Sequence, residues 1–181
     1  MGQHTDEELF EMFSKAGLEN QAFNHIVRKY QEAVYWHVRR LVISHDDTND
    51  IVQDVFIKAW QALPKFRQHS SLYTWIYRIA TNEALTFLKK KKRRNLMPMV
   101  DVSKQLEETL EADAYYRGND MEKKLQKAIL ALPEKQRVVF NMRYFDEMKY
   151  EDMAKVLDTS EGALKASYHH AVKKIEKSVV S

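Results

Sequence analysis

The sequence contains no cysteine, which excludes disulfide bonds and thiolate metal sites. Only four glycines and three prolines interrupt its 181 residues, whereas Ala, Leu, Glu and Lys are abundant. A β-sandwich or β-barrel needs many turns, and turns depend on glycine and proline. So few helix-breaking residues favour an all-α protein.

Long hydrophobic runs are also missing. No stretch approaches the roughly 18 consecutive apolar residues of a membrane span. The acidic N-terminal segment lacks the apolar centre and the small-residue cleavage site of a secretion signal. Hydrophobic residues still make up 44% of the chain, which is enough to build a core. We therefore expect a soluble, cytoplasmic protein.

Charge is small overall, at +3, but it is unevenly distributed. Residues 1–94 contain 15 Lys and Arg against 11 Asp and Glu, and six of these cations are consecutive, from Lys89 to Arg94. Residues 95–132 contain 5 cations against 7 anions. We expect residues 95–120, which include Pro98 and Gly118, to form a flexible acidic linker with a short helix around Gln105–Leu110.

Apolar residues recur at helical spacing in the N-terminal half. The pattern predicts helices over Phe23–Val42 and Ile51–Leu63, and a third from Leu72 to the cationic run. Pro64 is expected to end the second helix. The predicted N-cap residues of that helix are Asp47, Thr48 and Asn49.

The C-terminal half shows the same periodicity in shorter segments. A helix is predicted over Met121–Leu132, and Pro133 is expected to be the first residue of the next one. Two further helices follow in quick succession, Tyr150–Leu157 and a second one capped by Ser160. A short helix pair joined by about three residues has the spacing of a helix-turn-helix. We thus expect two helical domains, residues 1–94 and 121–181, the second containing this motif.

The closing segment, Thr159–Lys177, leaves its role open on pattern alone. A DNA-reading helix and an ordinary packed helix both fit. A metal site is disfavoured, because adjacent residues on a helix diverge by about 100°. The residues expected to pack inward are Ala163, Leu164, Ala171 and Ile175. Those expected to point outward are Glu161, Lys165, Ala166, His169 and His170.

Three blocks carry a resemblance to a known family. They are DTNDIVQDVFIKAWQALPKFR, SSLYTWIYRIATNEALTFLKKKKRR and ALPEKQRVVFNMRYFDEMKYEDMAKVLDTSEGALKASYHHAVKKI. In this order and spacing they resemble the extracytoplasmic-function group of bacterial RNA polymerase sigma factors. The resemblance covers about residues 20–94 and 121–177.

The resemblance implies a promoter-specificity subunit that is not itself an enzyme and needs no cofactor or small-molecule substrate. Residues 1–94 would bind core RNA polymerase and open the minus-ten element of promoter DNA. Residues 121–181 would read the minus-thirty-five element. Members of this group are commonly held inactive by an anti-sigma factor, which is often membrane-bound.

Specific residues follow from the matching positions. Contact with core polymerase is assigned to four polar residues that would otherwise be a solvated helix face: Asp50, Gln53, Asp54 and Lys58. The melted minus-ten strand needs rings that stack on bases together with polar groups, and these are Phe66, Arg67, Ser70, Ser71, Tyr73, Tyr77, Arg78 and Asn82.

The remaining assignments concern duplex DNA. Phosphate contacts, which give affinity and salt dependence, are assigned to Lys89, Lys90, Lys91, Lys92, Arg93, Arg94 and Arg143. Reading of the minus-thirty-five element is assigned to Ser160, Glu161, Gly162, Lys165, Ala166, His169 and His170.

This chain departs from the family in its last motif. Asp158 stands where Gly is usual, and Asp tolerates a left-handed backbone. In the recognition helix the family's Thr, Val, Ser, Arg and Arg are replaced by Ala163, Leu164, Ala166, Ser167 and His170. The absence of two arginines removes bidentate contacts to guanine, so the family's usual minus-thirty-five sequence is not expected.

Two other classes of protein are alternatives. A stand-alone helix-turn-helix regulator would bind duplex DNA as a dimer and would use residues 50–94 for dimerisation or effector binding. A nucleic-acid enzyme would need an acidic metal cluster, a phosphate-binding glycine loop or a nucleophile with its base, and the sequence shows none of these patterns.

Overall fold

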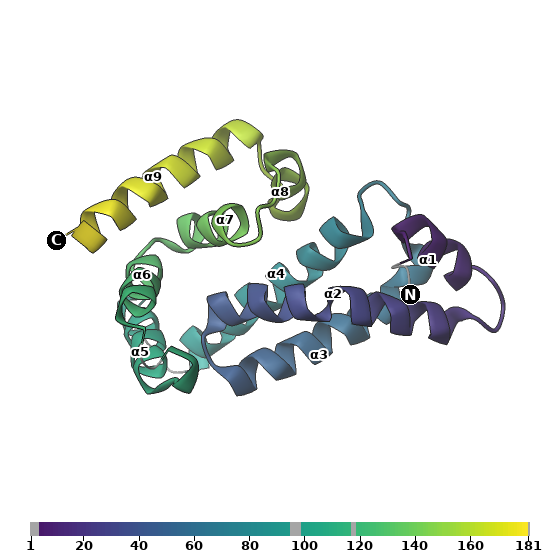
Figure 1. The fold of residues 1–181 in the computed structure, drawn as a ribbon, viewed down its shortest axis with the longest axis horizontal. Coiled ribbons are helices and arrows are strands. Elements are labelled where there is room, and N and C mark those ends of the chain that lie inside the picture. The colour runs from purple at the N-terminus through teal and green to yellow at the C-terminus, as the bar shows by residue number, and fades with distance from the viewer. Residues whose placement is uncertain (1–3, 95–98, 117–118, 181) are drawn as a thin grey trace.

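A computed structural model describes residues 4–94, 99–116 and 119–180, and no strand occurs within these ranges. The all-α prediction is confirmed. Figure 1 shows two groups of helices that lie against each other. The elements are α1 (Asp6–Phe13), α2 (Glu19–Val42), α3 (His45–Ala62), η1 (Leu63–Lys65), α4 (Leu72–Arg94), α5 (Met99–Ala112), η2 (Ala114–Tyr116), α6 (Asp120–Leu130), α7 (Glu134–Tyr144), α8 (Tyr150–Leu157) and α9 (Glu161–Val180).

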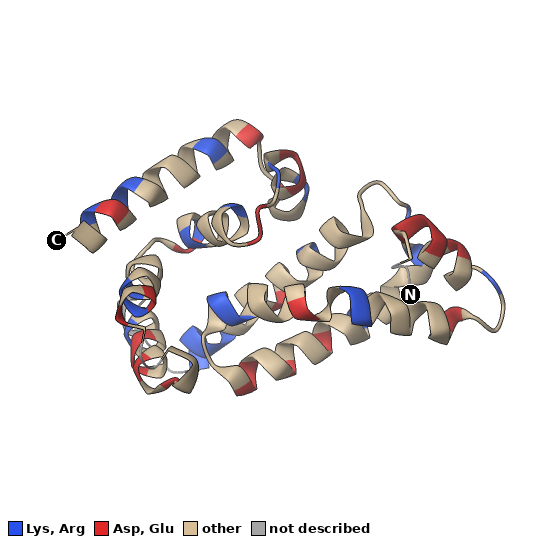
Figure 2. Ribbon diagram, in the orientation of Figure 1, with Lys and Arg blue, Asp and Glu red and all other residues tan. Residues whose placement is uncertain are grey.

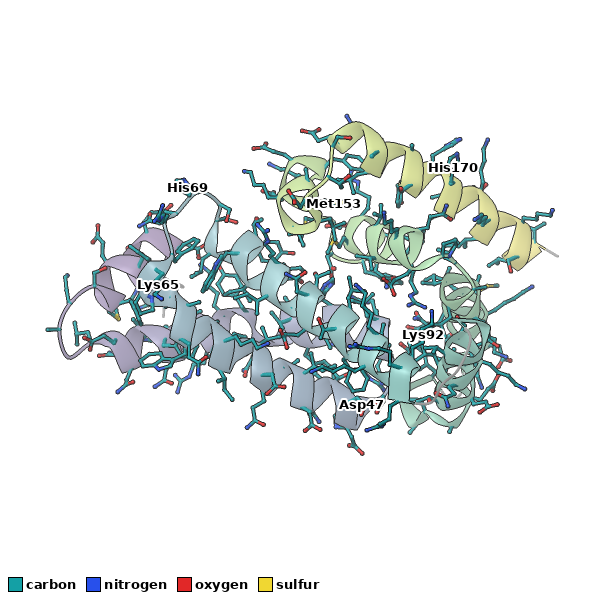
Figure 3. All side chains as sticks on the ribbon, turned by 180° about the vertical axis from the view of Figure 1, so that it is seen from behind. Asp47, Lys65, His69, Lys92, Met153 and His170 are labelled. Carbon is teal, nitrogen blue, oxygen red and sulfur yellow. The ribbon has the colours of Figure 1, made fainter. Side chains whose placement is uncertain are left out.

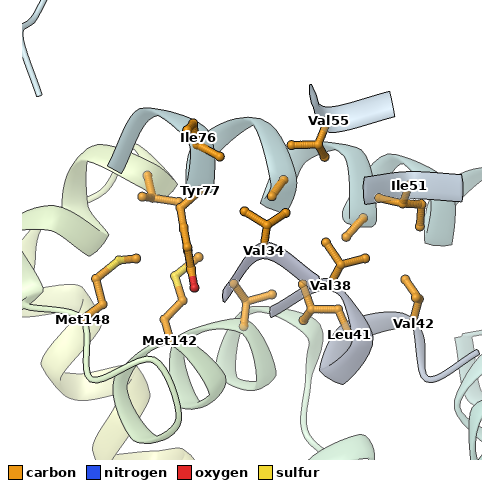
Figure 4. Packing of buried hydrophobic residues seen from close by; sticks show 14 of the residues in the cluster. Val34, Val38, Leu41, Val42, Ile51, Val55, Ile76, Tyr77, Met142 and Met148 are labelled. Atoms are coloured by element: carbon orange, nitrogen blue, oxygen red, sulfur yellow. The ribbon is translucent and has the colours of Figure 1, made fainter. Parts of the chain in front are cut away.

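The N-terminal half is a bundle in which α2, α3 and α4 all contact one another and α1 packs on α2. Its core is built from branched aliphatic side chains, including Val34, Val38, Ile51, Val55 and Ile76, each at most 5% exposed (Figure 4). Burial of one such side chain stabilises the fold by about 1.5–3 kcal/mol. In the described parts of the chain, no helix is both long enough and apolar enough to cross a membrane.

The start of α3 differs from the prediction. The helix begins at His45, and Ser44 is its N-cap, with the Ser44 Oγ accepting a hydrogen bond of 3.2 Å from the Asp47 backbone N–H. Asp47 and Thr48, predicted as caps, therefore lie inside the helix, as does Asn49. The apolar pattern starts only at Ile51, so it could not reveal the polar first turn. At the other end, Pro64 lies in η1 directly after α3, as predicted.

The described part of the predicted linker is mostly helical. Helix α5 is longer than the short helix expected around Gln105–Leu110, because Leu106 and Leu110 lie on one face of it and are buried. An ion pair between Arg39 and Asp113 ties the end of this segment to α2. Pro98 and Gly118, which were predicted to lie in the linker, fall outside the described residues.

The C-terminal half has its own small core. Ile129, Leu132, Phe140 and Ala171 are buried there, where α9 packs on α6 and α7. Pro133 is the N-cap residue of α7 and not its first helical residue, since its ψ of 144° is extended. The helix-turn-helix prediction is confirmed by α8 and α9.

The two halves share a continuous apolar contact. Helix α8 packs on α4, and α7 packs on α2. Met142 and Met148 are at most 3% exposed and lie beside Tyr77 of α4 (Figure 4). Met153 of α8 belongs to the same buried cluster. The chain therefore adopts a closed arrangement.

A buried ionic cluster lies at this contact. The Asp146 carboxylate accepts a hydrogen bond of 3.1 Å from Arg40 Nη1, and its other oxygen lies 3.0 Å from His37 Nδ1. The side chains of His37 and Asp146 are 0% and 5% exposed. His37 Nε2 lies 2.8 Å from Thr81 Oγ1, and the Arg40 guanidinium lies 4.5 Å from the centre of the Phe145 ring. One carboxylate from the C-terminal half thus joins two cation-forming residues of α2.

Replacing Asp146 by Ala is expected to loosen the closed arrangement. Removal of one partner from a buried ion pair costs about 3–5 kcal/mol, because the other partner is left without compensation. Small-angle X-ray scattering of the Asp146→Ala variant should give a larger radius of gyration than the wild type, with unchanged helical content by circular dichroism.

The matched control is Glu147→Gln, since Glu147 is the exposed neighbour of Asp146. This variant should scatter like the wild type. An Asp146→Ala protein as compact as the wild type would show that the ionic cluster does not hold the halves together.

Candidate nucleic-acid interface

The helix-turn-helix is set by two local features. Asp158 ends α8 in the left-handed conformation, with φ 51° and ψ 55°, which redirects the chain into α9. The Ser160 Oγ then accepts a hydrogen bond of 3.2 Å from the Ala163 backbone N–H at the start of α9. Both the turn at Asp158 and the cap at Ser160 were predicted.

One face of α9 packs inward through Leu164, Ala171 and Ile175, all buried as predicted. Tyr168 completes this line and stacks on Phe140, with ring centres 5.8 Å apart. Ala163 was predicted to pack inward but is exposed. Its position is about 100° around the helix from Leu164, outside the packing line.

The outer face of α9 is open to solvent. Glu161, Gly162, Lys165, Ala166, His169 and His170 are all exposed, and a Cβ atom added at Gly162 would meet nothing within 4 Å. His170 is labelled in Figure 3. Lys165 lies 3.8 Å from Glu161 and 5.6 Å from the centre of the Tyr150 ring. The face can therefore approach a DNA groove without rearrangement of α9.

The two adjacent histidines lie on the exposed part of α9. Their ring centres are 6.1 Å apart with planes inclined by 49°. Within the residues that the structure describes, no three side chains of His, Asp or Glu gather where they could hold an ion.

Arg143 has a structural role that the sequence did not reveal. Its Nη1 donates a hydrogen bond of 3.0 Å to the Met148 carbonyl oxygen, and its guanidinium lies 5.0 Å from the centre of the Tyr150 ring. These contacts hold the loop that leads into α8. A phosphate contact by Arg143 stays a prediction.

The predicted strand-binding residues divide into exposed and packed groups. Arg67, Ser71, Arg78 and Asn82 are exposed, and Ser70 is half-buried. They lie on the first turns of α4 and on the loop before it. His69, which belongs to this loop, is labelled in Figure 3.

The rings of this region pack against other rings. Phe66 is half-buried, with its ring centre 4.9 Å from that of Trp75 and 5.9 Å from that of Phe10. Tyr73 is also half-buried, and its ring centre lies 4.3 Å from that of Tyr77. Both Phe66 and Tyr73 therefore keep some exposed surface.

Tyr77 was predicted to bind the melted strand, but the structure places it in the core. It is 1% exposed, and its hydroxyl donates a hydrogen bond of 3.2 Å to the Ala33 carbonyl oxygen. Burial raises the pKa of its phenol above the ordinary value. In the closed arrangement Tyr77 is a core residue between α4, α2 and α7, and it cannot stack on a base.

The C-terminal half covers part of α4, the helix that was predicted to bind the melted strand. Thr74, in the first turn of α4, is 2% exposed, and its Oγ1 donates a hydrogen bond of 3.4 Å to Asp152 of α8. No sequence pattern predicts this hydrogen bond, because its two residues are far apart in the chain. Two predicted DNA-binding elements are thus packed against each other.

The cationic run forms the last turns of α4. Lys89, Lys90, Arg93 and Arg94 are exposed, and Figure 2 shows Lys and Arg in blue at this end of the helix. Lys91 lies 3.7 Å from Asp47 and 5.7 Å from the centre of the Phe87 ring. Lys92 is half-buried and is labelled with Asp47 in Figure 3. Four of the six cations are therefore exposed enough to reach phosphates.

The predicted polymerase-binding residues share the outer face of α3. Asp50, Gln53, Asp54 and Lys58 are exposed, and Lys58 forms an ion pair with Glu83 of α4. Figure 2 shows acidic residues in red along this helix. Ile57 is 49% exposed and Trp60 is 38% exposed on the same helix. From helical spacing in the sequence, Trp60 was expected to be buried in the apolar stripe of this helix. The same spacing gave no reason to expect that Ile57 would be exposed.

Two helical halves with an exposed helix-turn-helix are typical of DNA-binding proteins, and comparisons with known proteins identify the family. Residues 26–94 match Sigma-70 region 2, and residues 122–175 match Sigma-70, region 4. The RNA polymerase sigma-H factor of Pseudomonas aeruginosa is 31% identical over 187 residues, covering 98% of this chain and 95% of the relative. The ECF RNA polymerase sigma-E factor of Escherichia coli is 33% identical over 185 residues, with the same coverage. The chain belongs to the extracytoplasmic-function group of the sigma-70 family.

Solved structures share the fold. The sigma factor RpoE in complex with the anti-sigma factor NepR, from Bartonella quintana, has a TM-score of 0.69 and 21% identity, covering 88% of this chain and 97% of that one. CnrH in complex with the cytosolic domain of CnrY has a TM-score of 0.68 and 21% identity, covering 95% of each chain.

The outer face of α9 is expected to set sequence preference. In the double variant His169→Ala/His170→Ala, discrimination between promoter duplexes should fall by about 1–3 kcal/mol for each base that a histidine reads. The measurement is selection from a random duplex pool by the polymerase-bound protein. Lys173→Ala, on the same helix, is the control and should weaken binding to all sequences alike. An unchanged preference in the histidine variant would show that other residues read the DNA.

Proposed function

We propose that the chain is a dissociable subunit of bacterial RNA polymerase that selects promoters and assists their melting. Residues 1–94 bind core polymerase and capture the minus-ten strand, residues 121–181 read the minus-thirty-five element, and residues 95–120 connect them. The observation that carries the proposal is the open outer face of α9 on a chain whose two halves match the two sigma regions. The role requires no catalytic chemistry of its own.

The polymerase contact is proposed for the outer face of α3. Asp50, Gln53 and Asp54 are exposed there beside Ile57. Carboxylates around a partly exposed aliphatic side chain suit a partner helix with cations around an apolar centre. A stand-alone regulator would instead use this face for dimerisation or effector binding, and binding to core polymerase distinguishes the two functions.

The closed arrangement is proposed as the resting form. Contact between α4 and α8 covers Thr74 and buries Tyr77, so the strand-binding helix is blocked while the halves are together. Binding to polymerase and promoter therefore requires their separation, and it must supply the free energy of the contact.

An anti-sigma factor is proposed as a second protein partner. One similar solved structure is the sigma factor RpoE in complex with the anti-sigma factor NepR. Another is CnrH in complex with the cytosolic domain of CnrY. A partner of this kind would bind the same faces that polymerase and DNA need. It would thereby hold the chain inactive.

The proposed function is tested with core polymerase. The purified chain should bind sigma-free core in a pull-down and should direct transcription from a promoter. Asp54→Arg should reduce core binding by more than about tenfold, because it reverses a charge at the proposed interface. Its helical content should stay normal by circular dichroism.

Glu108→Arg is the matched control, since Glu108 is an exposed carboxylate on α5, away from the α3 face. This variant should bind core like the wild type. Failure of the wild-type chain to bind core polymerase would overturn the proposed function, and normal binding by Asp54→Arg would refute the assignment to α3.

Phosphate contact by the cationic run predicts a specific salt dependence. A variant in which the four exposed cations are replaced by Ala should bind DNA more weakly, whatever the DNA sequence. The four are Lys89, Lys90, Arg93 and Arg94. The slope of log K against log salt should flatten by about 1 for each side chain that binds a phosphate. Fluorescence anisotropy of the polymerase-bound protein at several salt concentrations measures this slope, and Lys15→Ala is the control. An unchanged slope would exclude phosphate binding by these side chains.

A further inference from the structure

A cavity of about 270 Å³ lies where the two halves meet the connecting helix. Its walls come from the end of α4, from α5 and from the segment that leads into α7. Leu88, Val102 and Leu132 form an apolar part of the wall. The polar part is formed by Lys89, Lys92, Ser103, Glu134 and Arg137. Lys89 and Lys92 also belong to the cationic run assigned to DNA phosphates, whereas Arg137 has no role assigned above.

Arg137 is the unusual residue of the cavity. It is 5% exposed, and its Nε has no hydrogen-bond partner among the described residues. Burial lowers the pKa of its guanidinium, and the charge of Glu134 opposes this to a smaller extent. Arg39 is similarly buried and also has one nitrogen without a partner, Nη1, but its Nη2 forms an ion pair with Asp113. A buried cation with an unsatisfied donor destabilises the fold unless an anion supplies the missing partner.

Other groups in the cavity also favour an anion. Three cationic side chains and one carboxylate line it. The first turn of α7 begins here, and its N-cap residue Pro133 offers no side-chain acceptor to the free N–H groups of that turn. Such N–H groups, with the positive end of the helix dipole, stabilise phosphates. A guanidinium and ammonium groups match the geometry and the double charge of a phosphate.

We propose that this cavity binds a phosphate-bearing small molecule, with Arg137 and Lys89 on the phosphate and the apolar wall around the rest of the ligand. Lys89 belongs to the N-terminal half and Arg137 to the C-terminal half. A ligand held by both would therefore stabilise the closed arrangement, as any ligand stabilises the form that binds it. This inference does not depend on the proposed role in transcription.

The test uses the full-length chain in a buffer free of phosphate. Inorganic phosphate, pyrophosphate and ADP are titrated by isothermal titration calorimetry at constant ionic strength, with chloride as the control anion. Saturable binding with a stoichiometry near one is expected for at least one phosphate compound. Arg137→Met should weaken that binding by about tenfold to a hundredfold, because it removes charge-assisted hydrogen bonds.

Two lysine variants keep the test valid if Arg137→Met does not fold. Lys89→Gln should weaken binding by about tenfold. Lys104→Gln, which changes an exposed lysine of α5 outside the cavity, should bind like the wild type. Equal effects of the two lysine variants would reveal general attraction to a cationic surface and overturn the proposal. The absence of saturable binding by all three probes would overturn it as well. The proposal would also be overturned if Arg137 were required only for binding to an unrelated DNA duplex. The cavity would then hold a phosphate of the DNA backbone.

Discussion

The buried carboxylate of Asp146 is the interaction on which the closed structure depends. It joins His37 and Arg40 of α2 to the loop between α7 and α8, at the centre of an apolar contact that includes Tyr77 and Met148. Buried charges of this kind are costly unless they are paired, so the cluster is stable only while the two halves are together. Separation of the halves removes the Asp146 carboxylate from both His37 and Arg40. The contact therefore favours two discrete states over a gradual opening.

This constraint connects the fold to its proposed role. The outer face of α9 is open in the closed form, whereas Thr74 in the first turn of α4 is covered by α8 and Tyr77 is buried. In the proposed role, the chain can thus present α9 to duplex DNA while part of α4 is covered. In the proposed role, core polymerase separates the halves before both act on one promoter. A ligand between α4, α5 and α7 would oppose that step, which would link promoter use to the concentration of a small molecule.

Much of the fold could be predicted from the sequence, because the helices follow local patterns. Apolar periodicity located α2, α4 and the body of α3. The helix-turn-helix was marked by the left-handed residue Asp158 and the cap residue Ser160. The features that could not be predicted depend on contacts between residues far apart in the chain. Tyr77 has an aromatic ring of the kind that stacks on bases, but it is buried beside Met142 and Met148 from the other half. His37 and Asp146 are separated by 109 residues, so no local pattern could pair them. The cap at Ser44 was missed because a polar first turn has no periodicity.

The closed resting form is tested most directly by a distance between the halves. The chain has no cysteine, so two can be introduced for dyes at the exposed positions Gln31 of α2 and Lys155 of α8. Single-molecule energy transfer should show one high-efficiency population for the free protein and a low-efficiency population once core polymerase is added. The same efficiency in both conditions would contradict a closed form that opens on polymerase binding.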